Sequence, residues 1–171
     1  MTAQPARGEM RGTAGRIGAV ETGVIAGLAR HAFPKAPMEV LERAEITPEL
    51  GIVGDARGRR KPGSAGKRQI TLMERADWAA AMAQVGADHP WWMRRCNIAV
   101  DGLDLPQRPG ALLRLGRDVV LEVTRFTDPC ERMEMLAPGL FAALVHDWRG
   151  GVCARVLAGG ALTVGDCIKE A

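Results

Sequence analysis

Residues 111–124 read Ala-Leu-Leu-Arg-Leu-Gly-Arg-Asp-Val-Val-Leu-Glu-Val-Thr, which is two apolar runs around a Gly-Arg-Asp turn. Apolar and β-branched runs joined by a short glycine-containing turn are typical of a β-hairpin. Residues 152–168 repeat the pattern around Gly159-Gly160 and predict a second hairpin. Successive strands with short turns favour a barrel, because closing a sheet removes its exposed edges.

The rest of the chain adds further strands and one clear helix. Strand-like runs occupy residues 23–31, 38–46, 68–73 and 96–100. Residues 74–85 predict a helix that covers the sheet, because they are rich in alanine, acidic near their start and followed by Gly86. We therefore predict a mostly β (α+β) fold, a β-barrel with a few short covering helices.

Length and composition indicate one globular domain. The chain has 171 residues, of which 47% are hydrophobic and 25% charged, and one domain of this size buries a substantial core. Residues 1–16 contain almost no bulky apolar side chain and predict a disordered tail. We expect the barrel domain to occupy residues 17–171.

Several classes of protein are disfavoured by the sequence. No apolar run approaches the roughly 20 residues of a membrane-spanning helix, and the first residues lack the apolar core of a signal peptide, so we expect a cytoplasmic protein without membrane contact. An aromatic content of 4% and a net charge of +3 disfavour nucleic acid as a partner. The cysteines form no C-x-x-C pair, and the histidines have no zinc spacing and are interpreted as structural or surface residues: Cys96, Cys130, Cys153 and Cys167, and His31, His89 and His146.

The positive charge is concentrated in one glycine-rich segment, residues 54–68. Glycines allow backbone N–H groups to turn toward an anion, and arginine and lysine supply fixed charge. The segment therefore predicts an anion-binding loop. For Arg59, Arg60 and Lys61 the alternative is that these side chains only form the solvated edge of a loop and bind no anion.

Cys130 lies where a short helix is expected to begin. Asp128 suits a capping position, Pro129 the first helical position and Glu131 a capping box. The N-terminal end of a helix favours thiolate over thiol, and Arg125 or Arg132 can add to this effect, whereas nearby glutamates oppose it. A thiolate is the form needed by a metal ligand or a sulfur-transfer nucleophile. Cys153 and Cys167 lie in apolar runs and are interpreted as packing residues.

The order of several segments resembles the MOSC (molybdenum cofactor sulfurase C-terminal) family. Each segment is weak alone, but together they span nearly the whole chain. They are Gly54-Asp55-Ala56-Arg57, Arg68-Gln69-Ile70-Thr71-Leu72, Arg95-Cys96-Asn97-Ile98-Ala99-Val100, Gly102-Leu103-Asp104-Leu105, Asp128-Pro129-Cys130, Gly151-Val152-Cys153-Ala154-Arg155-Val156-Leu157 and Gly165-Asp166.

The resemblance implies a β-barrel that binds molybdenum cofactor (molybdopterin), with Cys130 as molybdenum ligand, or that carries sulfur on Cys130 as a persulfide for cofactor or metal–sulfur maturation. Some relatives reduce N-hydroxylated bases, which implies a small-molecule substrate and a redox partner. The pyridoxal-phosphate-dependent desulfurase half of the cofactor sulfurases is not present in this sequence. A persulfide would therefore come from a separate cysteine desulfurase, and no lysine lies in a setting suited to binding pyridoxal phosphate directly.

The candidate site residues follow from the basic segment and the resemblance. Cys130 is the candidate catalytic residue and metal ligand, and the candidate cofactor-binding residues are Asp55, Arg57, Lys67, Arg68, Arg95 and Asn97. Where Arg57 stands, the family often has a histidine, which puts in doubt any role that needs an imidazole there. Three hypotheses remain: a molybdenum-dependent oxidoreductase, a sulfur carrier, and a non-catalytic anion or nucleic-acid binding module in which Cys130 is structural.

Overall fold

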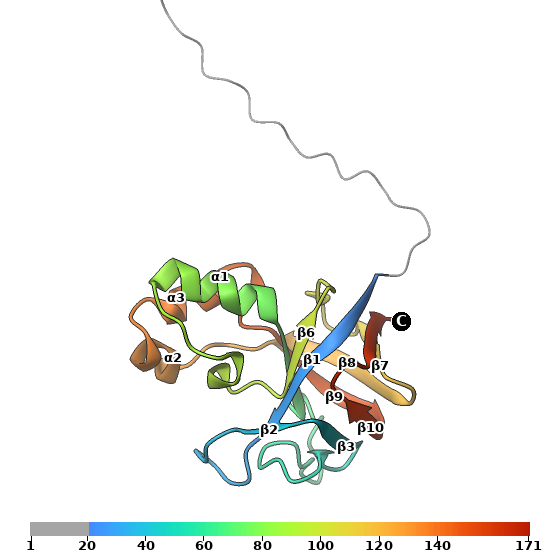
Figure 1. Ribbon diagram of the computed structural model, residues 1–171. Helices are drawn as coiled ribbons and strands as arrows, with labels where there is room; N and C mark the ends of the chain where they lie inside the picture. Colours follow the sequence, from blue (N-terminus) through green and yellow to red (C-terminus); the bar gives the residue numbers. More distant parts are fainter. Residues whose placement is uncertain (1–20) are drawn as a thin grey trace, which may run out of the picture.

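The computed structural model describes residues 21–171, and the predicted tail at residues 1–16 lies outside them (Figure 1). The strands are β1 (Thr22–Arg30), β2 (Glu39–Leu41), β3 (Arg43–Thr47), β4 (Gly51–Ile52), β5 (Ile70–Glu74), β6 (Ile98–Asp101), β7 (Leu112–Leu115), β8 (Val119–Phe126), β9 (Val152–Ala158), β10 (Gly160–Thr163) and β11 (Cys167–Glu170). The helices are α1 (Arg75–Val85), α2 (Glu131–Leu136) and α3 (Leu140–Val145), with 3₁₀ turns η1 (Trp91–Arg94) and η2 (His146–Trp148).

Seven strands of the described chain form a closed barrel. Their order is β11-β7-β8-β9-β5-β6-β1, and β1 pairs antiparallel with β11 to close the sheet, with Thr22 opposite Lys169. β2 extends β1 outside the barrel, and β10, β3 and β4 form a separate small sheet. The helices lie together on one side of the barrel (Figure 1). The predicted mostly β barrel with a few short helices is confirmed.

Alternation along the strands produces two apolar cores. Leu28, Leu72 and Ile98 belong to the core formed by the barrel strands. The residue that follows each of them (Ala29, Met73 and Ala99) belongs to a second core, which includes residues of α1, α2 and α3. Since successive side chains of a strand point to opposite faces, one face of each strand fills the barrel and the other carries the helices.

The predicted second hairpin is wrong. The Gly159-Gly160 segment does join β9 to β10, but β10 pairs with β3, with Leu162 opposite Ala44. The apolar run then breaks, and β11 returns to the barrel to pair with β7 and β1. The run predicted at residues 38–46 is similarly divided between β2 and β3, which lie in different sheets. The hairpin of β7 and β8 is confirmed, with Leu113 opposite Leu121.

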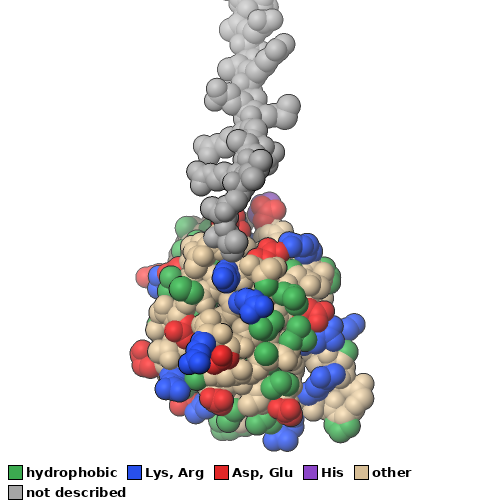
Figure 2. Space-filling model, turned by 90° about the vertical axis from the view of Figure 1, so that its right-hand side faces the viewer, with side chains coloured by type: hydrophobic (Ala, Val, Ile, Leu, Met, Phe, Trp, Pro, Cys, Tyr) green, Lys and Arg blue, Asp and Glu red, His purple; other side chains and the backbone are tan. Residues whose placement is uncertain are grey.

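The side of the barrel away from the helices shows positive and negative side chains interspersed rather than one field of positive charge (Figure 2). Within residues 21–171, no helix has the length and apolar character needed to cross a bilayer.

Glu74, at the start of α1, has an unusual carboxyl group. Its Oε1 accepts a hydrogen bond from the backbone N–H of Leu105 at 2.7 Å. Burial is the main cause that raises the pKa of Glu74 to about 7. The negative charges of Asp77 and Asp104 also raise this pKa, whereas the hydrogen bond from Leu105 lowers it. Because the folded state holds this proton more tightly than the unfolded state, the contribution to stability is complete below about pH 4.5. It is lost as the pH rises to about 7.

A Glu74→Gln variant should therefore be more stable than the parent protein at pH 8. The expected gain is about 1–2 kcal/mol, less than the full pKa difference implies because solvent partly screens the carboxylate. Glutamine keeps the oxygen that accepts from Leu105. Urea unfolding at pH 5 and pH 8 measures the effect, with exposed Glu45→Gln as control. An equal stability difference at both pH values would contradict the assignment.

Candidate functional site

Cys130 lies in a cavity of about 250 Å³ formed by four separate segments. They are the residues after β1, the loop between β4 and β5, the end of η1, and the segment that leads from β8 into α2. We call this space the Cys130 cavity. Its lining residues are His31, Lys35, Arg57, Arg68, Arg94, Arg95, Thr127, Asp128, Cys130, Arg132 and Met133.

The lining is strongly basic. Within the described part of the chain, six of the residues that line the cavity have positively charged side chains. Asp128 is the acidic residue of the lining. Burial, and then the neighbouring guanidiniums of Arg132 and Arg57, lower the pKa of Arg95. The cations therefore lie close enough to disfavour one another, and an anion in the cavity would relieve this repulsion.

Cys130 is exposed and immediately precedes α2. Its backbone is extended (φ −124°, ψ 172°), and its carbonyl accepts the N–H of Met133 at 2.8 Å. The helix was predicted to have Asp128 as its cap and Pro129 as its first residue; instead Cys130 is the cap and Glu131 the first residue, two positions later. Asp128 does not cap the helix, since its carboxylate accepts from Arg125 Nη1 at 3.1 Å. The thiol stands at the cavity wall, where solvent and ligands reach it.

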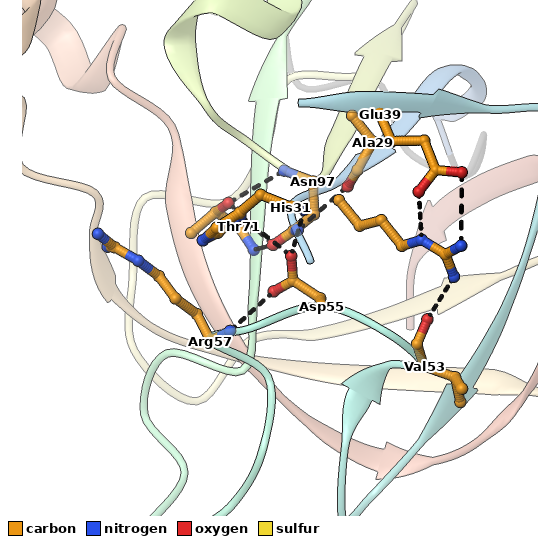
Figure 3. Close-up of polar contacts among 9 residues, drawn as sticks. Ala29, His31, Glu39, Val53, Asp55, Arg57, Thr71 and Asn97 are labelled. Atoms are coloured by element: carbon orange, nitrogen blue, oxygen red, sulfur yellow. Dashed lines mark hydrogen bonds and ion pairs between the residues drawn. The ribbon is translucent and has the colours of Figure 1, made fainter. Parts of the chain in front are cut away.

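Asp55 is buried behind the cavity and organises two of its walls (Figure 3). Its Oδ1 accepts the backbone N–H of His31 at 3.0 Å, and its Oδ2 accepts that of Arg57 at 3.3 Å. The same Oδ1 lies 3.2 Å from His31 Nδ1. One carboxylate therefore ties the end of β1 to the basic loop, and it does so without lining the cavity itself.

His31 is a site residue that the sequence interpretation missed. It is 3% exposed, lines the Cys130 cavity, and neither ring nitrogen has a hydrogen-bond partner within residues 21–171. Burial lowers the pKa of His31, Asp55 opposes this, and Arg95, Arg57 and Arg132 lower it further. The imidazole is therefore neutral at neutral pH and can hydrogen-bond a ligand.

Arg94 holds the Cys130 segment in place. This buried side chain donates from Nη2 to the carbonyls of Thr127 at 2.9 Å and Gly150 at 3.0 Å. Its Nε and that of Arg68 are buried without a partner among the described residues, and both side chains line the cavity. Unsatisfied donors in a cavity favour a ligand with acceptor oxygens. Arg94 was also missed, although it directly precedes Arg95.

The other predicted residues are distributed as follows. Arg57, Arg68 and Arg95 line the Cys130 cavity, whereas Lys67 and Asn97 are not among its lining residues. Lys67 is exposed, and its carbonyl accepts a hydrogen bond from Thr124 Oγ1.

Asn97 is committed to holding strands together (Figure 3). Its Oδ1 accepts from the backbone N–H of Thr71 at 3.0 Å and from Thr71 Oγ1 at 3.2 Å. Its Nδ2 donates to the Ala29 carbonyl at 3.2 Å. These bonds join β1 and β5 to the segment before β6, so the Asn97 side chain has a structural task.

The basic loop is divided between two places. Arg57 and Arg68, at its ends, face the Cys130 cavity, whereas Arg60 and Lys61 line a separate open groove with Arg155. Among the described residues, no group of three or more His, Cys, Asp or Glu side chains is arranged to hold a metal ion.

The fold and site together define a class: β-barrel proteins with one accessible cysteine in a small, arginine-lined cavity. A family model described as MOSC domain matches residues 52–169, and the chain belongs to this family. No curated protein matches the chain.

Three solved structures have the same fold. The YUAD protein from Bacillus subtilis superposes with a TM-score of 0.72 at 20% identity, covering 87% of this chain and 95% of that one. YiiM from Geobacillus stearothermophilus has a TM-score of 0.67 at 13% identity, with coverages of 87% and 75%. YiiM from Escherichia coli has a TM-score of 0.62 at 15% identity, with coverages of 86% and 69%. At these identities the likeness concerns the fold.

Proposed function

We propose that the Cys130 cavity binds molybdenum cofactor, with Cys130 as the protein's ligand to the metal. The observation that carries the proposal is the combination of one exposed thiol with six basic side chains around a space of about 250 Å³. Molybdopterin carries a phosphate and a dithiolene, so its site needs fixed positive charge and a soft donor. The cofactor, when bound, would supply two-electron redox chemistry at the metal.

Different side chains of this cavity would bind different parts of the cofactor. Arg68 and Arg94 hold buried Nε–H groups without a hydrogen-bond partner in residues 21–171, and these suit phosphate oxygens. Arg57 and Arg95 add charge at the wall, and the pKa of Arg95, lowered by burial, rises again when an anion is bound. Neutral His31 offers a hydrogen bond without adding another cation. Cys130, on the segment that leads from β8 into α2, supplies the sulfur donor.

Molybdenum content tests this proposal directly. The full chain and a Cys130→Ser variant are expressed in a host that makes the cofactor, purified without oxygen, and analysed for molybdenum and for released pterin. The parent should hold close to one molybdenum per chain, and Cys130→Ser should lose most of it. Cys167→Ser, which removes another exposed cysteine located on β11, should keep it. Equal molybdenum in the parent and Cys130→Ser, or none in any variant together with no uptake of added cofactor, would refute the proposal.

A second candidate, a sulfur carrier, is favoured by the exposure of the Cys130 thiol. In this reaction the Cys130 thiolate attacks the outer sulfur of a desulfurase persulfide, the donor's S–S bond breaks, and the donor cysteine leaves as a thiolate. Intact mass after incubation with such a donor should then rise by one sulfur atom. The same gain in Cys130→Ser would exclude Cys130 as the carrier.

A further inference from the structure

A second hollow of about 540 Å³ adjoins the Cys130 cavity. Four side chains line both spaces and form the boundary between them: Lys35, Arg95, Arg132 and Met133. Beyond the boundary the lining becomes apolar. We call this second space the methionine groove, and its remaining lining residues are Pro37, Met38, Trp92, Met93, Met135 and Leu136.

The methionine groove has the chemistry of a small-molecule site. Met93 and Met135 are 39% and 83% exposed, although large apolar side chains are usually withdrawn from solvent. Methionine is flexible and polarisable, and its sulfur makes favourable contacts with aromatic rings. Trp92 adds an aromatic wall, supported edge-on by Trp91 with ring centroids 6.0 Å apart. Few polar side chains other than the boundary cations line this groove, so it suits an apolar ring better than a polar pterin.

The backbone is strained at the boundary. Lys35 (φ 65°) and Arg95 (φ 67°) have left-handed conformations that non-glycine residues rarely adopt. Such conformations cost free energy and persist where the surrounding structure imposes them, commonly at ligand sites. Here two strained residues are both basic and both line the two spaces. Their placement is an observation independent of the apolar lining.

We propose that the methionine groove binds the aromatic body of a small anionic substrate, whose charged and reacting end enters the Cys130 cavity between Lys35 and Arg95. The inference rests on the proposed function in taking the Cys130 cavity as the reacting site. Because the two spaces adjoin at these cations, one ligand can place its charged end in the Cys130 cavity and its ring in the methionine groove. Arginine near an aromatic face adds cation–π attraction.

Three probes test the inference on the full chain without molybdenum. Inorganic phosphate has the charge alone, phenol the ring alone, and phenyl phosphate both. Isothermal calorimetry, supported by tryptophan fluorescence because Trp92 lines the groove, measures binding. Phenyl phosphate should bind about tenfold more tightly than inorganic phosphate, because only it buries a ring. Equal affinities, or no binding of phenyl phosphate, would overturn the inference.

Substitutions then locate the ring. Met93→Ser and Met135→Ser should each remove a large part of the phenyl phosphate advantage and leave inorganic phosphate affinity unchanged. Leu157→Ser, at an exposed apolar residue of β9, is the control and should change neither. Arg95→Asn should weaken both probes, since asparagine tolerates the left-handed backbone and removes the positive charge. Unchanged phenyl phosphate binding in both methionine variants would overturn the inference. Since no cofactor is present, failure here leaves the molybdenum result of Cys130→Ser as a separate outcome.

Discussion

An Asp55→Ala variant should lose about 2–4 kcal/mol of unfolding free energy, because one buried and one part-buried backbone N–H group lose their acceptor. These donors, on His31 and Arg57, start two of the four segments that line the Cys130 cavity. The carboxylate is also the negative group that raises the pKa of His31 against its cationic neighbours. Removing it leaves the cations of the cavity less compensated. Urea unfolding followed by tryptophan fluorescence measures the loss.

Asp55→Asn is the matched control for the charge. Asparagine keeps one acceptor oxygen and the side-chain shape, so its loss should be about half that of alanine. In both variants the pKa of His31 should fall further, because the group that raises it is gone. Titration of the His31 ring by NMR checks this shift. A His31 pKa unchanged in both variants, together with parental stability, would show that Asp55 does not organise the cavity.

Gly151→Ala should destabilise the protein by about 3 kcal/mol or more. Gly151 has φ 92°, and a Cβ built on it would lie 2.1 Å from the Leu72 carbonyl oxygen of β5. That oxygen belongs to backbone, which cannot swing away as a side chain can. Gly151 also accepts the N–H of Thr127 at 2.9 Å, next to the carbonyl bound by Arg94. The substitution should therefore displace the segment that leads to Cys130.

Gly63→Ala measures the cost of a left-handed backbone without a steric clash of the added Cβ. Gly63 has a similar φ of 74°, but nothing lies within 4 Å of its added Cβ. Its cost should be about 1–2 kcal/mol, the penalty of a left-handed alanine alone. Thermal and urea unfolding of both variants measure the difference. Equal losses for the two variants would contradict the role given to the close approach of β5.

The parts of the fold that depend on local signals were predictable. The helix expected at residues 74–85 is α1, and Gly86 ends it with φ 68°, as a glycine cap should. The hairpin of β7 and β8 follows from its short turn, where Gly116 has φ 57°. In both cases the residues that determine the element are adjacent in the sequence.

Errors arose where pairing is long-range. Gly159-Gly160 has the composition of a hairpin turn, yet β10 pairs with β3, more than a hundred residues earlier in the chain. Leu162 is fully buried in the barrel core that it shares with Ala44, and this tertiary packing outweighs the local turn signal. No pattern within residues 152–168 indicates that the chain leaves β9 for another sheet.

The candidate site was predictable where the motif residues themselves line it. Arg57, Arg68, Arg95 and Cys130 share one cavity, with Asp55 behind them. Asn97 has a similar place in its motif, but its amide is used between strands. His31 joins the site because the end of β1 lies beside Asp55 in the loop after β4, a contact between segments more than twenty residues apart. Spacing in the sequence therefore could not identify it.

The pairing of β1 with β11 has a consequence for synthesis of the protein. Along one edge β1 pairs with β6, from the middle of the chain; along the other, Leu28–Arg30 pair with β2 and Thr22–Val24 pair with β11, at Cys167–Glu170. On the ribosome, the Thr22–Val24 part of this edge therefore stays unpaired until nearly every other strand has emerged. A nascent chain stalled before Cys167 presents an open edge to other chains, so aggregation during translation should concentrate at that stage.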